Sequence, residues 1–203
     1  MANFTPTIPL EAALPVFYQY GLQTASNESL ALALHTTAPE LTAAYPTRDG
    51  LVQHVMQADM DRQKREHTEL YAHYSTAVER LYGLLQMGLR DMATMPGQFY
   101  ADLQADFPKS WGIVMDHLAD YSAPQLQQLL NDGVRSRLFR SDINIQLVTK
   151  ILLEQVNMML NPQIFPPDRF NMSEVFRSIF LYYIRGICTD EGARIAAEHF
   201  SRI

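Results

Sequence analysis

Hydrophobic residues recur along the chain at the three- and four-residue spacing of amphipathic α-helices. The first such stretch begins at Leu10, continues through Phe17 and ends at Gly21, a residue type that often follows a helix. Pro15 lies inside this stretch and should kink or delay the helix, because proline cannot donate a backbone hydrogen bond. No sustained alternation of polar and apolar residues indicates a β-strand. The pattern predicts an all-α chain with helices over residues 10–20, 26–34, 38–44, 48–73, 75–95, 97–106, 108–120, 123–138, 144–160, 173–187 and 190–200.

The predicted helices fall into two groups by length, which indicates two domains. The first three are short and end before Pro46, whereas the fourth covers Arg48–His73. Thr37 is a predicted N-cap, and Pro39 with Glu40 suits the first turn of a helix. We therefore expect one small domain at residues 1–47 and a larger helical domain at residues 48–203.

The composition is that of a folded, globular chain. The 203 residues are 47% hydrophobic and 19% charged, with 9 Gly and 11 Pro, which fits neither a disordered nor a collagen-like protein. No uncharged apolar run reaches the length of a membrane-spanning helix, and no basic segment precedes an apolar stretch as in a secretory signal. The single cysteine, Cys188, cannot form an internal disulfide. We expect a reducing, cytoplasmic location and no contact with a membrane.

The motifs of common enzyme classes are absent from the sequence. It contains no phosphate-binding loop, dinucleotide fingerprint, Gly-x-Ser-x-Gly or His-Glu-x-x-His. The six histidines lack the spacing of metal ligands, and no paired acid and base is visible. The sequence therefore predicts a protein that is not an enzyme, with no catalytic residue, metal or cofactor.

Three elements in the first 51 residues resemble regulators of the TetR (tetracycline-repressor) family. Residues 10–21 and 26–33 are similar to the first two helices of that family. Residues 36–41 (TTAPEL) stand where the family has its turn and recognition helix. Residues 45–51 (YPTRDGL) resemble its Phe-Pro-Ser-Lys-Glu-x-Leu element, which opens a long fourth helix.

This resemblance implies an all-α homodimer with a three-helix, helix-turn-helix head and a larger helical domain for ligand binding and dimerisation. The second helix of the helix-turn-helix would lie in the major groove of a duplex DNA operator. A small hydrophobic effector would control DNA binding from the larger domain. The residues that the resemblance places at or near the DNA are Ser26, Thr36, Thr37, Glu40, Thr42 and Arg48.

The head departs from the family pattern in its charge. Residues 1–47 contain no Lys or Arg and carry a charge of −3 from Glu11, Glu28 and Glu40. Thr42 stands where the family usually has a phosphate-contacting tyrosine, and His35 replaces the usual glycine of the turn. A dimer whose only basic contact is Arg48 neutralises roughly two phosphates, so log Kobs should fall with log salt at a slope of about −2, against about −5 to −9 for a typical binder.

Two hypotheses therefore remain open. The first is a TetR-type repressor with unusual, weakly electrostatic operator contacts. The second is a small-molecule or lipid-binding protein with the same fold whose head no longer binds DNA.

Met and aromatic residues are abundant in the expected ligand-binding domain. A soft lining of this kind suits a hydrophobic effector, although any single residue of these types is more often part of an ordinary core. The candidate polar selectors are Gln86, Arg90 or His117. The candidate ligand-binding residues are Tyr82, Gln86, Met92, Trp111, Met115 and His117.

The last two long helices are apolar on more than one face. Such helices need neighbours on both sides, which a four-helix dimer interface supplies. The predicted interface residues are Ile145, Val148, Leu152, Phe176, Ile179, Phe180 and Tyr183.

Overall fold

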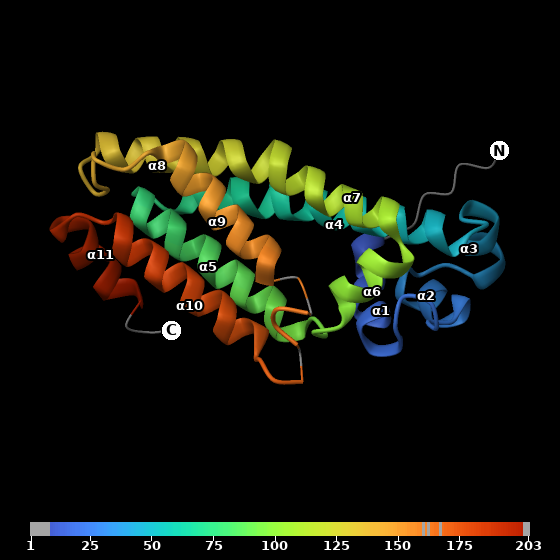
Figure 1. Cartoon of the computed structure of the whole chain (residues 1–203). Coiled ribbons are helices and arrows are strands. Elements are labelled where there is room, and N and C mark those ends of the chain that lie inside the picture. Colours follow the sequence, from blue (N-terminus) through green and yellow to red (C-terminus); the bar gives the residue numbers. More distant parts are fainter. Residues whose placement is uncertain (1–8, 160, 162, 167, 201–203) are drawn as a thin grey trace. The chain divides into compact units, whose positions relative to one another are not determined.

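A computed structural model describes residues 9–159, 161, 163–166 and 168–200, the last without its side chain (Figure 1). The elements among these residues are helical, apart from one isolated β-bridge between Phe139 and Cys188. Every described helix is too short or too polar to cross a membrane. The contacts divide the chain into two compact units, each with its own hydrophobic core.

Unit 1 consists of Met95–Asp116 and the described part of Met1–Arg65. Its elements are the 3₁₀ helix η1 (Leu10–Ala13), α1 (Leu14–Tyr20), α2 (Asn27–Ala33), α3 (Ala38–Ala44), the first part of α4 (Arg48–His73), α6 (Phe99–Asp106) and α7 (Pro108–Asp116). Phe17, Leu34 and Leu41 from the short helices share its core with Met56 of α4 and Leu103 of α6. The first three helices are thus built into a core that extends over α4, α6 and α7.

Unit 2 consists of Glu66–Thr94 and the described part of His117–Ile203. Besides the end of α4, it contains α5 (Ala77–Thr94), the π-helical segment η2 (His117–Ser122), α8 (Ala123–Arg135), α9 (Ile145–Met159), α10 (Met172–Ile187) and α11 (Asp190–Phe200). Figure 1 shows α9 and α10 side by side, and α10 and α11 both pack against α5. Close packing of α5 and α10 depends on Gly88, because a Cβ there would come within 2.3 Å of the Phe176 ring.

The helices lie within about three residues of their predicted ends, and two of them change helix type. The α-helical part of the first helix begins only at Leu14, so that Pro15 falls in its first turn, where a proline is tolerated. The helix predicted over 108–120 changes to π-helical geometry after Asp116. Leu160, the predicted end of α9, lies outside the described residues.

The units do not coincide with the two domains expected from helix length. Residues 48–65 and 95–116 share a unit with the short helices, although they were expected in the second domain. The physical reason is that α4, α6 and α7 contribute side chains to the same core as α1 to α3. The functional division at residues 47 and 48 stays a prediction.

Gly133 of α8 provides a test of packing in unit 2. A Cβ at this position would lie 1.9 Å from a ring carbon of Phe139. We expect Gly133→Ala to lower the free energy of unfolding by about 1–3 kcal/mol, because the ring must move out of a close-packed site. Chemical denaturation followed by circular dichroism measures this change.

Gly112 of α7 is the matched control, since a Cβ there would meet no atom within 4 Å. Gly112→Ala should raise the free energy of unfolding by about 0.5–1 kcal/mol, as expected for alanine in a helix interior. Equal effects of the two substitutions would contradict the packing described for Gly133.

Candidate functional site

The segment α2–turn–α3 has the geometry of a helix-turn-helix. The side chain of Ser26 caps α2 by accepting a hydrogen bond from the Ser29 N–H at 3.1 Å. His35 in the turn has a φ of 51°, in the left-handed region that the family usually fills with glycine. The Thr36 N–H donates to the Ala31 carbonyl at 2.9 Å, which closes the turn onto α2. The local sequence thus fixes a short connection between the two helices.

The start of α3 is held by a reciprocal capping box. Glu40 Oε2 accepts hydrogen bonds from the Thr37 N–H at 3.1 Å, the Thr37 hydroxyl at 2.7 Å and the Thr36 hydroxyl at 2.9 Å. These bonds, the Thr37 hydroxyl first, hold the pKa of the Glu40 carboxyl below its usual value. The candidate DNA-binding residues Thr36, Thr37 and Glu40 therefore lie together at the N-terminus of α3, where they form hydrogen bonds with one another.

Arg48, the first basic residue of the chain, is turned towards the interior of unit 1. Its Nη2 donates to the Ala25 carbonyl at 2.5 Å and to Asn27 Oδ1 at 3.3 Å, and its guanidinium lies 5.8 Å from the centre of the Phe17 ring. Burial lowers the pKa of Arg48 from its ordinary value. The guanidinium therefore serves contacts within the protein, and its role as a phosphate contact stays a prediction.

A second link extends this network to α3. The Asn27 amide donates to the Thr42 hydroxyl at 3.1 Å. Thr42 is the residue at the position of the family's phosphate-contacting tyrosine. Through Arg48 and Asn27, side chains of α1, α2, α3 and α4 are therefore joined in one cluster, which we call the Arg48 clamp.

The fold also brings an exposed cation to the start of α4, one that no sequence pattern singles out. Lys109, at the start of α7, has its Nζ 3.9 Å from Asp49 Oδ2 in the first turn of α4, and its side chain is 75% exposed. The two residues are 60 positions apart in the sequence, so no local pattern connects them. Lys109 is the candidate phosphate contact that sequence reasoning missed.

The candidate ligand-binding residues are divided between the two units. Trp111 and Met115 belong to unit 1, where both pack against its core and the Trp111 ring lies 6.2 Å from that of Tyr100. Met92 packs against the core of unit 2. Neither unit by itself therefore contains the complete predicted set.

Within unit 2, Tyr82 lies next to α11, and Gln86 is bonded to Tyr82. The Gln86 amide donates to the Tyr82 hydroxyl at 3.1 Å, and the Tyr82 ring lies 5.1 Å from that of His199. Gln86 is exposed to solvent.

His117 belongs to a cluster of rings that includes α4. Its ring lies 4.9 Å from that of Tyr121, which stacks on His67 at 5.7 Å with an interplanar angle of 10°. The Tyr121 side chain also forms a hydrogen bond with the side chain of Gln125. Tyr71 lies near Tyr121, and its burial, followed by the effect of Tyr121, raises its pKa to about 12. We call His67, Tyr71, His117, Tyr121 and Gln125 the ring cluster.

The ring cluster is the candidate ligand contact in unit 2. It combines partly or fully buried aromatic side chains with polar groups and lies at a π-helical segment, a feature frequent at functional sites. The spacing of His117 and Tyr121 is visible in the sequence, whereas His67 is 50 residues away. Among the described residues, no group of three or more His, Cys, Asp or Glu side chains could hold a metal ion.

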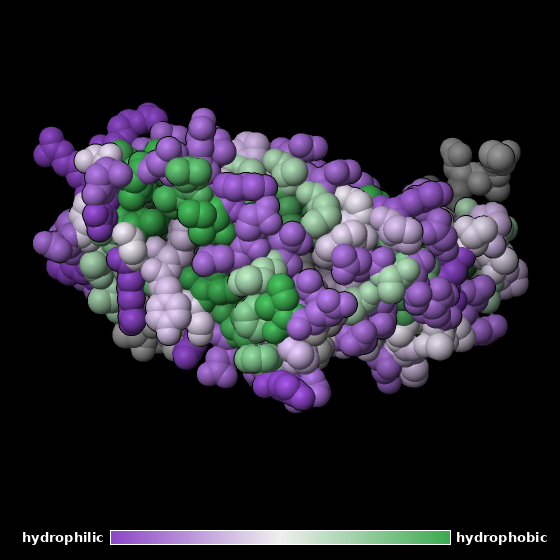
Figure 2. Space-filling model, in the orientation of Figure 1, coloured by the Kyte–Doolittle hydropathy of each residue, from purple (hydrophilic) through white to green (hydrophobic). Residues whose placement is uncertain are grey.

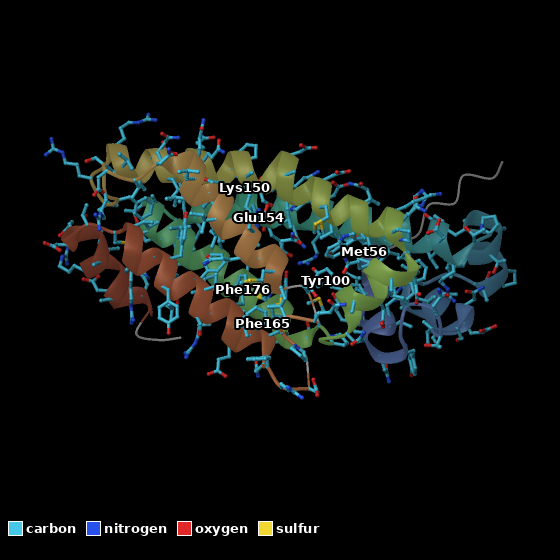
Figure 3. The ribbon with its side chains drawn as sticks, in the orientation of Figure 1. Met56, Tyr100, Lys150, Glu154, Phe165 and Phe176 are labelled. Atoms are coloured by element: carbon cyan, nitrogen blue, oxygen red, sulfur yellow. The ribbon has the colours of Figure 1, made fainter. Side chains whose placement is uncertain are left out.

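Three of the predicted dimer residues face the core of their own unit. Leu152, Phe176 and Phe180 are buried in unit 2, and the rings of Phe176 and Phe180 lie 4.6 Å apart. Phe176, labelled in Figure 3, packs at Gly88 of α5. These three side chains are therefore covered by the core of their own unit, and their place in an interface stays a prediction. An all-apolar helix pattern does not tell which face the chain itself covers.

The outward faces of α9 and α10 carry a different set of apolar side chains. The exposed fractions are 59% for Leu147, 54% for Ile151, 38% for Met158 and 72% for Tyr182. The predicted residues Ile145, Val148, Ile179 and Tyr183 are partly buried. Figure 2 shows hydrophobic side chains gathered over α9 and α10, with hydrophilic ones between them.

No protein-family model matches the chain, and no curated protein matches it. Solved structures do match, over most of its length. A TetR-family transcriptional regulator from Agrobacterium tumefaciens is 14% identical with a TM-score of 0.67, and 89% of this chain aligns with 95% of that one.

Two further solved structures are similar and contain small molecules. A transcriptional regulator from Saccharomonospora viridis in complex with choline is 16% identical, with a TM-score of 0.66, over 89% of this chain and 95% of that one. FadR from Bacillus subtilis in complex with stearoyl-CoA is 13% identical, with a TM-score of 0.63, over 88% and 97%. This chain therefore has the all-α fold of TetR-type transcriptional regulators, and the resemblance seen in its first 51 residues is confirmed at the level of fold.

The Arg48 clamp can be tested by removing its charge. Arg48→Met should lower the free energy of unfolding by about 1–3 kcal/mol, because the Ala25 carbonyl and the Asn27 amide oxygen lose a donor. Lys109→Ala, which removes an exposed cation of the same unit, should change it by less than about 0.5 kcal/mol. Urea denaturation measures both, and an Arg48→Met protein as stable as the Lys109→Ala control would show that the clamp contributes nothing.

Proposed function

We propose that this protein is a TetR-like transcriptional regulator: a homodimer whose binding to operator DNA is controlled by a small hydrophobic effector. The observation that carries the proposal is the helix-turn-helix of Ser26–Ala44, with both helices capped, in a chain that has the fold of such regulators over most of its length. In this function the protein performs no covalent chemistry and acts in the cytoplasm.

The ring cluster and the ligands of the similar proteins support effector binding. The Bacillus subtilis FadR structure holds stearoyl-CoA and the Saccharomonospora viridis structure holds choline, so the fold accommodates both acyl-chain and cationic molecules. In this chain, Tyr121 lies between His67 and His117, so that aromatic rings and polar ring atoms are gathered in one place. We place the polar end of the effector there.

The charges of the head favour a second candidate, a small-molecule or lipid-binding protein that has lost DNA binding. Arg48 is engaged by Ala25 and Asn27, and the Glu40 carboxylate lies at the N-terminus of α3, where a DNA phosphate would be repelled. Lys109 is then the cation that can meet a phosphate. The two candidate functions differ in whether this single contact, together with helix N-termini and threonine hydroxyls, is sufficient for DNA binding.

A salt titration of DNA binding separates the two candidates. With one basic contact in each protomer, the regulator should bind a fragment flanking its gene with a slope of log Kobs against log salt of about −2. Lys109→Ala should bring that slope close to zero. Electrophoretic mobility shifts or fluorescence anisotropy at several salt concentrations give the slope.

Each other outcome has a definite meaning. No complex at low salt with any flanking fragment, together with a hydrophobic ligand that co-purifies in native mass spectrometry, would favour the second candidate. A tight complex with a slope of −5 or steeper would contradict the scarcity of basic contacts argued above.

Dimer formation is supported by a repeated pattern on α9 and α10. Leu147, Ile151, Glu154 and Met158 follow a 4-3-4 spacing on the exposed side of α9. On α10, the residues with the same spacing are Val175, Ile179, Tyr182 and Gly186. This is the spacing by which helices pack in coiled coils and four-helix bundles, so the two stripes suit the same pair of helices from a second copy.

We expect Ile151→Asp and Tyr182→Asp each to produce folded monomers, because each places a carboxylate in the apolar part of the interface. Gln128→Asp on the exposed side of α8 is the control and should remain dimeric. Sedimentation equilibrium at micromolar protein measures the association. If the Ile151→Asp and Tyr182→Asp variants both dimerise with the affinity of the wild type, this face is not the interface.

A further inference from the structure

One charged residue stands in the apolar stripe of α9. Glu154 occupies the third position of the stripe, between Ile151 and Met158. Lys150 lies one turn before it, with its Nζ 2.5 Å from Glu154 Oε1, and Figure 3 labels the two residues on the same helix. Both side chains are exposed. A carboxylate at this position needs a reason, because the neighbouring positions are apolar.

Pairing within the helix is a weak reason. An exposed ion pair four residues apart contributes about 0.3–0.5 kcal/mol, and the order found here, with the lysine nearer the N-terminus, is the less favourable one. The hydrogen bond from Lys150, followed by one from Asn157, lowers the pKa of Glu154, so the carboxylate is charged at neutral pH. Covering the Lys150–Glu154 pair with an apolar surface would remove water from both charges and leave each compensated only by the other.

A second copy of the chain can supply the compensation by symmetry. In an interface with a two-fold axis, residue i of one copy meets residue j of the other, and j meets i. If two α9 helices run antiparallel about an axis near residue 152, Lys150 of each copy comes opposite the partner's Glu154. The same register brings Leu147 close to the partner's Met158, so that apolar residues also meet.

We propose that in the homodimer Lys150 and Glu154 exchange partners, each forming its ion pair with the other residue of the second copy. The two exchanged pairs set the antiparallel register of the α9 helices and restrict the face to a copy of the same chain. This inference rests on the dimer in the proposed function. It commits the outward face of α9 to a second copy.

Charge reversal tests the exchange. Lys150→Glu and Glu154→Lys each bring like charges together twice in a homodimer, so each should raise the dimer dissociation constant at least tenfold. An equimolar mixture of the two variants should form heterodimers, because every altered residue then faces a residue of opposite charge. The double variant Lys150→Glu/Glu154→Lys should dimerise like the wild type.

The mixture is the decisive measurement. An ion pair confined within one helix is restored in the double variant but not by mixing the two single variants, whereas a pair between two copies is restored in both cases. Native mass spectrometry distinguishes homodimers from heterodimers when one variant is isotopically labelled. Circular dichroism of each variant checks that it is folded, as expected for substitutions of exposed side chains.

Each result decides the inference. A heterodimer fraction well above the statistical half supports the exchange. A statistical mixture, or single variants that dimerise like the wild type, overturns the exchange of ion pairs. If Ile151→Asp still dissociates in that case, the dimer through this face stands. A wild-type chain that is monomeric at all accessible concentrations overturns both this inference and the proposed dimer.

Discussion

The Arg48 clamp is the interaction on which the arrangement of the head depends. It joins the ring of Phe17 in α1, the start of α2 at Ala25 and Asn27, and Thr42 of α3 to the first residue of α4. The guanidinium is partly buried, and its Nη2 bonds to two acceptors at the start of α2, which holds that segment against the first residue of α4. The charge that a DNA-binding head would direct outwards is used to hold the head together.

The local structure of the head could be predicted from the sequence because its causes are local. Ser26, Thr37 and Glu40 act within three or four residues, and Thr37 caps the helix for which it was predicted, with Glu40 in its first turn. Pro15 delays the first α-helix, and His35 adopts a positive φ in the turn, for reasons that a short window of sequence contains. The all-α fold followed from the same kind of pattern.

The parts that could not be predicted depend on contacts between distant segments. Phe176 and Leu152 were expected in an interface, because the sequence shows that α9 and α10 are apolar but not that α8 packs on α9 and that α5, with Gly88, packs on α10. Trp111 was grouped with His117, although the two belong to different compact units. Lys109 could not be identified at all, because its neighbour Asp49 is 60 residues away and no periodicity relates them.

The π-helical segment His117–Ser122 allows the length of the chain to vary before α8. A π-helical turn holds about one residue more than an α-helical turn, so the residues after it keep nearly the angle that they would have without the extra residue. Loss of one residue there would return the turn to α-helical geometry and leave Leu126, Leu129 and Leu130 of α8 facing the core that they fill. The change would fall on His117 and Tyr121, which lie in the wide turn itself. The ring cluster can therefore be rebuilt in evolution without repacking the core beside it.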